Sequence, residues 1–157
     1  MILEHPSTTS FRAALERLGG LGRVVVLPDS VHTAALAAEA LGCEVGAIAN
    51  SLVFNADDAP VLILTSGAHR VDTEKVATAL GVTALRRATP EFVRGHTGQA
   101  IGGVSPIDHP FPVPTYLDPW LRRYDQIWAA AGHPSAVFDT TYEELLSMTG
   151  GTELEVG

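Results

Sequence analysis

The stretch Ala47–Thr65, AIANSLVFNADDAPVLILT, decides how this chain folds, because it contains two strand-like segments joined by a polar turn. Along Ala47–Phe54 alternate side chains point to opposite faces, which places Asn50 on an otherwise apolar face. The polar turn is Asn55–Pro60, and the apolar run Val61–Thr65 has the length of a buried strand. We therefore predict a hairpin whose second strand is well buried.

Helices and further strands are predicted on both sides of this hairpin. The helices are indicated by apolar residues at helical spacing, by Ala and Leu content, by Gly at the end or by Thr at the start. We expect helices near residues 11–18, 33–41 and 73–80, a fourth from residue 89 and a last one from residue 140. Strands are expected near residues 24–27, 115–117, 126–129 and 136–138.

The order of these elements predicts the fold class. With 157 residues and 46% hydrophobic content, the chain has room for one ordinary domain with its own core. Hairpin-like and crossover connections are mixed and do not alternate strictly. We predict an α+β fold, a single compact domain with a mixed β-sheet flanked by helices. Residues 1–150 form this domain, and residues 151–157 are expected to be a frayed acidic C-terminal tail.

The formal charge of −8 argues against a general attraction to polyanions such as nucleic acid. Local clusters remain available for a ligand, namely Arg86, Arg87 and Arg94, and the pair Arg122 and Arg123. The alternative is that both groups are solvated surface. Lys75 is the only lysine, so a function that needs a lysine has one candidate.

The compartment is predicted from the N-terminus and from cysteine usage. The opening MILEHPSTTS lacks the basic segment of an export signal, and no apolar stretch approaches the roughly 20 residues that cross a bilayer. Cys43 is the single cysteine, which excludes an internal disulfide. We expect a cytoplasmic protein that does not enter a membrane.

Familiar chemical motifs are missing from the sequence. Its six histidines form no HExxH, HxH or Cys/His pair at metal-ligand spacing. It contains no GxGxxG, no Walker-type phosphate loop and no GxSxG elbow. We therefore expect neither a metal site nor a cofactor.

The segment Thr97–Pro106, TGQAIGGVSP, is unusual because it holds three glycines, a threonine and a serine within ten residues. Glycine lets the backbone approach a ligand closely, so Gly102 and Gly103 are candidates to direct N–H groups at a carbonyl oxygen that becomes negative during acyl transfer. The alternative is a tight turn or bulge without a ligand.

Three other polar residues also have two interpretations. Asn50 is either a buried amide satisfied by backbone or an amide that offers a donor and an acceptor to a pocket. His133 lies in a predicted loop between Gly132 and Pro134. Asp139 ends a predicted strand just before a helix, where it can also serve as a simple cap.

Together these segments resemble the YbaK-type deacylases, relatives of the editing domain of bacterial prolyl-tRNA synthetases. The segment Thr97–Pro106 is similar to the family signature TGY-x-x-GG-[IV]-SP, with Gln99 in place of its Tyr. His32–Ala35 with Ala40–Gly42, Gly67–Val71 and Ala130–Leu145 resemble further family segments in the same order. The resemblance covers most of the chain.

The resemblance implies a mixed sheet flanked by helices and an activity that hydrolyses the ester between a wrong amino acid and the 3′ end of tRNA. It implies no metal. In such domains the ester is positioned against backbone donors of the glycine segment, with help from substrate hydroxyls. Partners implied are the acceptor end of an aminoacyl-tRNA and, further, an aminoacyl-tRNA synthetase.

Besides the signature Tyr, a second family residue is replaced in this chain. The family commonly has the strand motif I-x-K-[ST]-L, whereas Ile48–Leu52 reads IANSL and has Asn50 at the lysine position. A neutral amide keeps hydrogen bonding but loses the longer-range attraction of an ammonium group for phosphate or developing negative charge. Lys75 is predicted on a helix after a different strand and does not substitute.

The resemblance gives two functional hypotheses. The first is a trans-editing hydrolase for a mischarged aminoacyl-tRNA with a small amino acid, and the second is a non-catalytic module that binds an amino-acid-like ligand or a charged tRNA end. A third, hydrolysis of an unrelated small ester or amide, stays open. Candidate catalytic residues are Asn50, Gly102 and Gly103; candidate substrate-binding residues are His32, Thr33, Ser51, Arg70, Ser105, His133 and Asp139.

Overall fold

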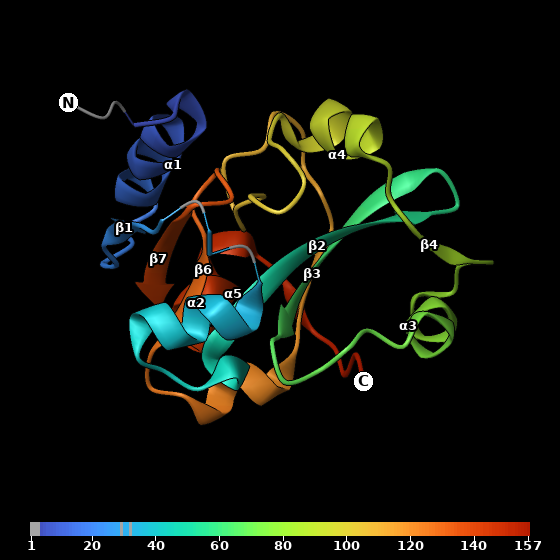
Figure 1. The fold of residues 1–157 in the computed structure, drawn as a ribbon. Coiled ribbons are helices and arrows are strands. Elements are labelled where there is room, and N and C mark those ends of the chain that lie inside the picture. Colours follow the sequence, from blue (N-terminus) through green and yellow to red (C-terminus); the bar gives the residue numbers. More distant parts are fainter. Residues whose placement is uncertain (1–3, 29, 32) are drawn as a thin grey trace.

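The computed structural model describes residues 4–28, 30, 31 and 33–157. Among these residues a mixed eight-stranded sheet is flanked by helices (Figure 1), which confirms the predicted fold class. The helices are α1 (Pro6–Arg17), α2 (Ala34–Leu41), α3 (Thr73–Leu80), α4 (Pro90–Thr97) and α5 (Tyr142–Thr149), with short 3₁₀ turns at Val45–Ala47 and Pro119–Arg123. The strands are β1 (Val24–Val26), β2 (Ile48–Ala56), β3 (Ala59–Ser66), β4 (Leu85–Arg87), β5 (Thr115–Leu117), β6 (Ile127–Ala130), β7 (Ala136–Thr140) and β8 (Thr152–Glu153).

The predicted hairpin is confirmed as the antiparallel pair β2 and β3, which runs through the middle of the sheet. Every residue of β3 from Val61 to Ser66 is buried. Asp57 and Asp58 form the turn with φ values of 51° and 73°, as in the type I′ turns that suit a hairpin. The carboxylate of Asp57 also accepts hydrogen bonds from Thr83 and Ala84, which fastens the turn to the chain just before β4.

The sheet is open along one part of β2. On the side away from β3, β2 pairs with β6 through Ile48 and Ala49, and with β4 through 54–56. Residues 50–53 pair with neither strand on this side. On this side, β2 therefore has β6 next to one end, β4 next to the other, and no paired strand in between.

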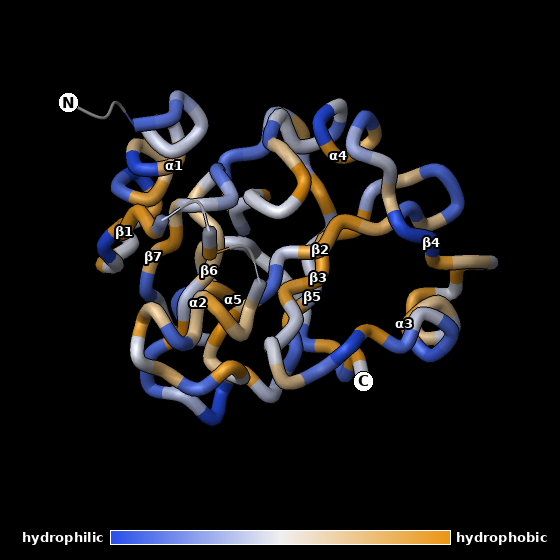
Figure 2. Tube along the Cα trace, viewed as in Figure 1, coloured by the Kyte–Doolittle hydropathy of each residue, from blue (hydrophilic) through white to orange (hydrophobic). Residues whose placement is uncertain are grey.

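Three apolar clusters cover the sheet, and their distribution explains the environment of Asn50. Ile48 packs in the cluster under α2, and Phe54 packs in the cluster under α3. Both lie on the same face of β2 as Asn50 and Leu52, because side chains alternate. The middle of the hairpin lies between α2 and α3 (Figure 1), and Figure 2 shows its strands as mainly hydrophobic. Asn50 and the half-covered Leu52 therefore face a region that neither helix fills.

The C-terminal segment departs from the prediction of a frayed tail, which was wrong. Residues 152 and 153 form β8 beside β5, and Val156 is 1% exposed within the cluster under α3. The backbone of Val156 accepts a hydrogen bond from Asp72, the residue that caps α3. Apolar side chains at 154 and 156 anchor this acidic end to the domain.

Smaller differences concern element boundaries. α1 starts at Pro6, five residues before the predicted region, and β4 was not predicted at all. The capping threonine of α5 is Thr141 and not Thr140, because Thr140 remains in β7 opposite Ile127. In the part of the chain that the structure describes, no helix has the length and apolarity needed to cross a bilayer.

Candidate active site

A cleft of about 500 Å³ lies at the gap in the sheet between β6 and β4. Residues 48–54 of β2 form its floor. One wall comes from α2 through Thr33 and Ala37, and another comes from the glycine segment through Gly102 and from β4 through Arg87. A ligand in this cleft therefore reaches both the side chains and the backbone edge of β2.

Ser51 presents unpaired polar atoms to the cleft. The carbonyl of Ile48 accepts a hydrogen bond from Gly67 on the β3 side of the strand. Since backbone groups alternate along a strand, the N–H and C=O of Ser51 point to the other edge, where the sheet is open. Its hydroxyl is buried and has no partner among the described residues. A buried polar group without a partner costs free energy, so this position is suited to a polar ligand.

Asn50 also lines the cleft, from the face of β2 opposite to that of the Ser51 side chain. It is partly buried, and no hydrogen bond joins its side-chain amide to another described residue. Of the two interpretations given above, the geometry matches the amide that is available to a pocket. No other described residue engages the donor or the acceptor of Asn50, so both can bind a ligand.

The two glycines of the candidate site have different roles in the fold. Gly102 has a φ of 87° and lines the cleft, and its N–H has no partner among the described residues. The N–H of Gly103 donates to the carbonyl of Ala100 at 3.0 Å, which closes a tight turn. A Cβ on Gly103 would lie 2.5 Å from backbone atoms of His133 and Pro134. Gly102 thus offers a donor, whereas Gly103 allows two loops to pack closely.

Thr33 and His133 lie at or next to the cleft but use their side chains within the protein. The Thr33 hydroxyl caps α2 by accepting from the N–H of Leu36. The His133 ring accepts from the N–H of Ser135 and packs on the ring of His5 at 4.7 Å. Thr33 itself lines the cleft, whereas His133 does not and its neighbour Pro134 does.

Three other predicted residues do not line the cleft. Ser105 is 0% exposed and bonded to Gln99 and Ile107 within its own segment. Asp139 accepts from the backbone of Arg23 and from the side chain of Gln126. Arg70 is exposed beyond the end of β3, and His32 lies outside the described residues.

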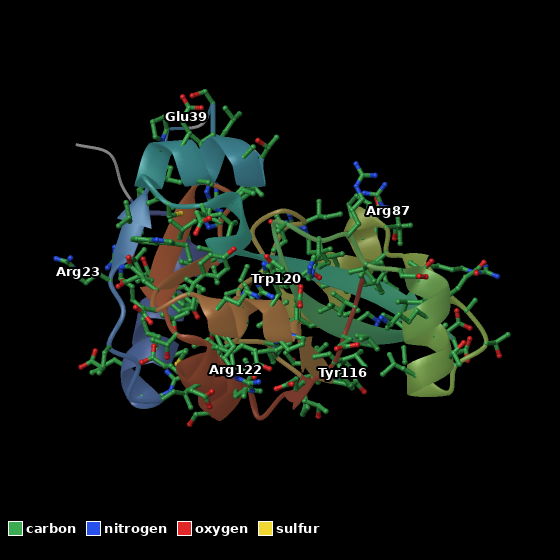
Figure 3. The ribbon with its side chains drawn as sticks, turned by 90° about the horizontal axis from the view of Figure 1, so that it is seen from below. Arg23, Glu39, Arg87, Tyr116, Trp120 and Arg122 are labelled. Carbon is green, nitrogen blue, oxygen red and sulfur yellow. The ribbon has the colours of Figure 1, made fainter. Side chains whose placement is uncertain are left out.

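Arg87 is the only charged side chain among the described residues that line the cleft. Figure 3 shows it projecting outward beside α4, on the side of the molecule opposite to Arg122. Arg122 instead binds Glu153 and packs over the ring of Tyr142, and Arg123 stacks on Trp120. Of the two arginine clusters in the sequence, only the first borders the cleft. Sequence reasoning missed this distinction because it depends on tertiary contacts.

The described residues that line the cleft supply neither a titratable acid nor a base. His109, three residues after the glycine segment, does not line the cleft, and its Nε2 lies 2.8 Å from the carbonyl of Ser105. Burial lowers the pKa of His109, so its ring is neutral near pH 7. In the described part of the chain, no group of three His, Cys, Asp or Glu residues is arranged to hold a metal ion. The available chemistry is therefore hydrogen bonding to a polar ligand, with one cation at the rim.

Comparisons with known proteins agree with this architecture. The aminoacyl-tRNA editing domain family matches residues 28–148. The uncharacterized protein YwhH of Bacillus subtilis is 33% identical over 123 residues, covering 78% of each chain. The candidate Cys-tRNA(Pro)/Cys-tRNA(Cys) deacylase EbsC of Enterococcus faecalis is 32% identical over 120 residues, covering 76% of this chain and 73% of that protein.

The fold comparison extends over nearly the whole chain. A crystal structure described as that of a candidate trans-editing enzyme for prolyl-tRNA synthetase superposes with a TM-score of 0.92 at 46% identity, covering 98% of both chains. The proline–tRNA ligase of Levilactobacillus brevis is 35% identical over 82 residues, which are 14% of that longer enzyme. The cleft, the glycine segment and these matches together lead to one conclusion: the chain belongs to the aminoacyl-tRNA editing domain family, and its resemblance to YbaK-type proteins is confirmed.

Proposed function

We propose that this protein is a trans-editing hydrolase that cleaves the ester of a mischarged aminoacyl-tRNA carrying a small amino acid. One observation supports this most directly. Within a fold of the editing family, Asn50, Ser51 and Gly102 line one cleft. The side-chain amide of Asn50, the hydroxyl of Ser51 and the N–H of Gly102 have no hydrogen-bond partner among the described residues. A site that holds an ester needs such donors and acceptors.

The proposed reaction is ordinary ester hydrolysis. The oxygen of a water molecule adds to the carbonyl carbon, and the carbonyl oxygen becomes negative next to the Gly102 N–H. The bond between the carbonyl carbon and the ribose oxygen then breaks, and that oxygen takes a proton, leaving a free amino acid and uncharged tRNA. Asn50 orients the ester or the water. A hydroxyl of the substrate assists the proton transfer, because the described lining contains no titratable acid or base.

The lining also supports a small amino acid as the acyl group. Small side chains such as Ala37, Ala49 and Ala129 alternate with branched ones such as Val53 and Val104 around the cleft. An apolar pocket of this kind excludes larger side chains by size, although it separates similar small ones only weakly. Alanine, serine, cysteine and proline are the candidates to test.

The proposed partner is the acceptor end of a charged tRNA. Arg87 at the rim supplies a positive charge for a terminal phosphate, a role for which Asn50, at the position of the family lysine, lacks the charge. A synthetase that forms the mischarged tRNA is a further proposed partner. Such substrates place the protein in the cytoplasm.

The deciding experiment is deacylation of a panel of tRNAs mischarged with small amino acids, compared with uncatalysed ester loss. We expect turnover with at least one substrate, and its loss in Gly102→Ala. The variant Arg87→Gln should raise KM more than it lowers kcat, because the Arg87 side chain lies away from the reacting ester in this proposal. Absence of turnover with every substrate would contradict the proposal.

The second candidate function is a binding module without turnover, and it is favoured by the neutral Asn50 at the lysine position. The variant Asn50→Lys separates the two functions. If the unmodified protein is silent and Asn50→Lys deacylates, the protein is a binding module that lost catalysis. If the unmodified protein is active, we expect Asn50→Lys to change kcat by less than about tenfold, and the binding module is excluded. Activity on small esters that is independent of tRNA would instead indicate an unrelated hydrolase.

A further inference from the structure

The side chain of Gln99 joins the two ends of the glycine loop, defined here as residues 98–108. Gln99 is 3% exposed. Its Oε1 accepts from the N–H of Ser105 at 2.6 Å and lies 3.0 Å from the hydroxyl of Ser105. Its Nε2 donates to the carbonyl of Asp108 at 3.2 Å. One amide therefore bonds to residues six and nine positions further along the chain.

The backbone of Gln99 is itself fixed to the end of α4. Its N–H donates to the hydroxyl of Thr97, and that hydroxyl bonds in turn to the carbonyl of Val93. Thr97 is 1% exposed. The connection from Val93 through Thr97 and Gln99 to Ser105 thus ties the far side of the loop to a helix.

Gly102 lies between the two ends that Gln99 joins. Glycines have more accessible backbone conformations than other residues, so a turn with two adjacent glycines loses more entropy when it is ordered. Within the loop, the bond from Gly103 to Ala100 fixes only the turn itself. The direction of the Gly102 N–H relative to the cleft depends on how the whole turn is held. The bonds of Gln99 hold both sides of it.

We infer that Gln99 is a positioning residue that sets the Gly102 N–H in the cleft, an inference that rests on the proposed function. It acts through Ser105 and Asp108 and does not touch the substrate. Glutamine suits this place because its amide is an acceptor at one atom and a donor at the other. The hydrogen bonds of the Gln99 side chain to Ser105 and Asp108 are called the brace from here on. Ser105 is buried and hydrogen-bonded to Gln99, so it belongs to the brace and not to the substrate pocket.

The test compares Gln99→Leu and Gln99→Glu with the unmodified protein. Leucine removes all three bonds, and a misplacement of about 1 Å at a reacting group can cost roughly a hundredfold in rate. We expect Gln99→Leu to lower kcat by about that factor with KM changed less than about twofold. Gln99→Glu keeps an acceptor for Ser105 but loses the donor to Asp108, so its kcat should lie between the two.

Two control variants separate positioning from general loss of stability. Gln126→Leu removes an exposed glutamine whose side chain bonds to Asp139 on the surface, and it should leave kcat unchanged. Val76→Ala opens a cavity in the buried cluster under α3, remote from the loop in sequence and packing. It should lower the thermal midpoint while kcat at a temperature well below that midpoint stays the same.

Amide hydrogen exchange of Gly103, measured without substrate, tests the brace independently of activity. We expect exchange at Gly103 to be faster in Gln99→Leu than in the unmodified protein, and unchanged in Gln126→Leu. Folded Gln99→Leu with unchanged kcat, or a loss that lies wholly in KM, overturns the inference. If the unmodified protein shows no turnover, the proposed function fails, and unchanged exchange at Gly103 then overturns the inference separately.

Discussion

At the scale of single residues, Gly102 and Gly103 are adjacent and identical but have different roles in the structure. Gly102 has a backbone conformation with φ of 87°, yet a Cβ there would meet nothing closer than 3.9 Å. At Gly103, a Cβ would lie 2.5 Å from the backbone of the loop at His133 and Pro134. A side chain at 102 is opposed by the backbone conformation, and one at 103 by a clash.

These differences predict what an alanine would cost at each of the two positions. Gly102→Ala keeps the backbone N–H but should lose about 1–2 kcal/mol of stability through its left-handed backbone. If the backbone rotates to relieve this strain, the N–H turns away from the oxyanion, and kcat should fall by up to about 10²–10³-fold. Gly103→Ala should lose about 1–3 kcal/mol through overpacking. Gly95→Ala, within α4 and with open space around it, should gain about 0.5–1 kcal/mol. Urea unfolding and deacylation check all three; full activity in a Gly102→Ala protein that has lost this stability would show that the backbone conformation at 102 does not limit catalysis.

His109 gives a prediction for the dependence of stability on pH. Burial lowers the pKa of His109 below its usual value near 6.5, against smaller opposing effects of the Ser105 carbonyl and of Asp108. Because the pKa is lower in the folded state, the unfolded chain takes up the proton first as the pH falls. The stability linked to this residue is therefore complete above about pH 6.5 and is lost as the pH falls below it.

We expect the variant His109→Gln to reduce this loss, since its amide can still donate to the Ser105 carbonyl but does not titrate. The measurement is the free energy of unfolding at pH 7.5 and pH 5.5 for both proteins. The drop between these pH values should be smaller in the variant. Equal drops in the two proteins would show that His109 does not contribute.

At the scale of elements, β2 decides where the site lies. The alternation in its sequence correctly predicted a strand and an unusual polar residue at Asn50. The gap beside residues 50–53 was not predictable, because β6 lies more than seventy residues further along the chain and β4 was missed. A three-residue strand such as β4, with two consecutive arginines, carries too little periodicity to be recognised alone.

The C-terminal strand β8 carries the prediction at this scale. Removal of residues 152–157 exposes the cluster around Val156 and removes Glu153, which accepts from Tyr142. Burial of one valine contributes about 1.5–3 kcal/mol, and 1 kcal/mol corresponds to about 2–4 °C for a chain of this size, so the thermal midpoint should fall by roughly 4–10 °C.

The control for this truncation is Glu155→Gln, which changes the charge of the same segment at a side chain that is 80% exposed. It should leave the thermal midpoint within about 1–2 °C, as expected for an exposed surface ion pair. A truncated protein with an unchanged midpoint would mean that β8 adds nothing to stability.

At the scale of the whole molecule, the charge of −8 limits how tRNA can bind. This balance argues against a general attraction to polyanions, and Arg87 is the cation that the described lining places at the cleft. Binding of a single-stranded acceptor end should therefore involve few phosphates, and a salt dependence of about −0.7 per phosphate contact gives a shallow slope. We expect weak binding with a total slope of about −1 to −2.

Arg87→Gln tests this distribution of charge. It should weaken tRNA binding several-fold and make the salt slope shallower by about 0.7. Arg23→Gln makes the same change in net charge at an exposed residue on another side of the molecule (Figure 3) and should alter neither. Fluorescence anisotropy with labelled tRNA over a range of KCl concentrations measures both quantities. A steep slope that survives Arg87→Gln would indicate a different binding surface.

The sequence by itself determined the central hairpin, the approximate positions of the helices, the glycine segment and the family. These features are local: they follow from periodicity, from turn residues and from motifs of a few neighbouring positions. The predicted site residues were less uniform, since Asn50, Ser51, Thr33 and Gly102 line the cleft while Ser105, Arg70 and Asp139 do not.

Only the tertiary structure decided the gap beside β2, the use of the Gly103 N–H within its turn, the brace at Gln99 and the choice of Arg87 over Arg122. It also placed the C-terminal residues in the sheet. Each of these depends on which distant segments pair or pack against one another, and a residue's own neighbours in sequence do not specify that. The residues that carry the chemical groups of the site could thus be found in the sequence. Whether those groups are free to bind a ligand depends on which distant segments pair with one another.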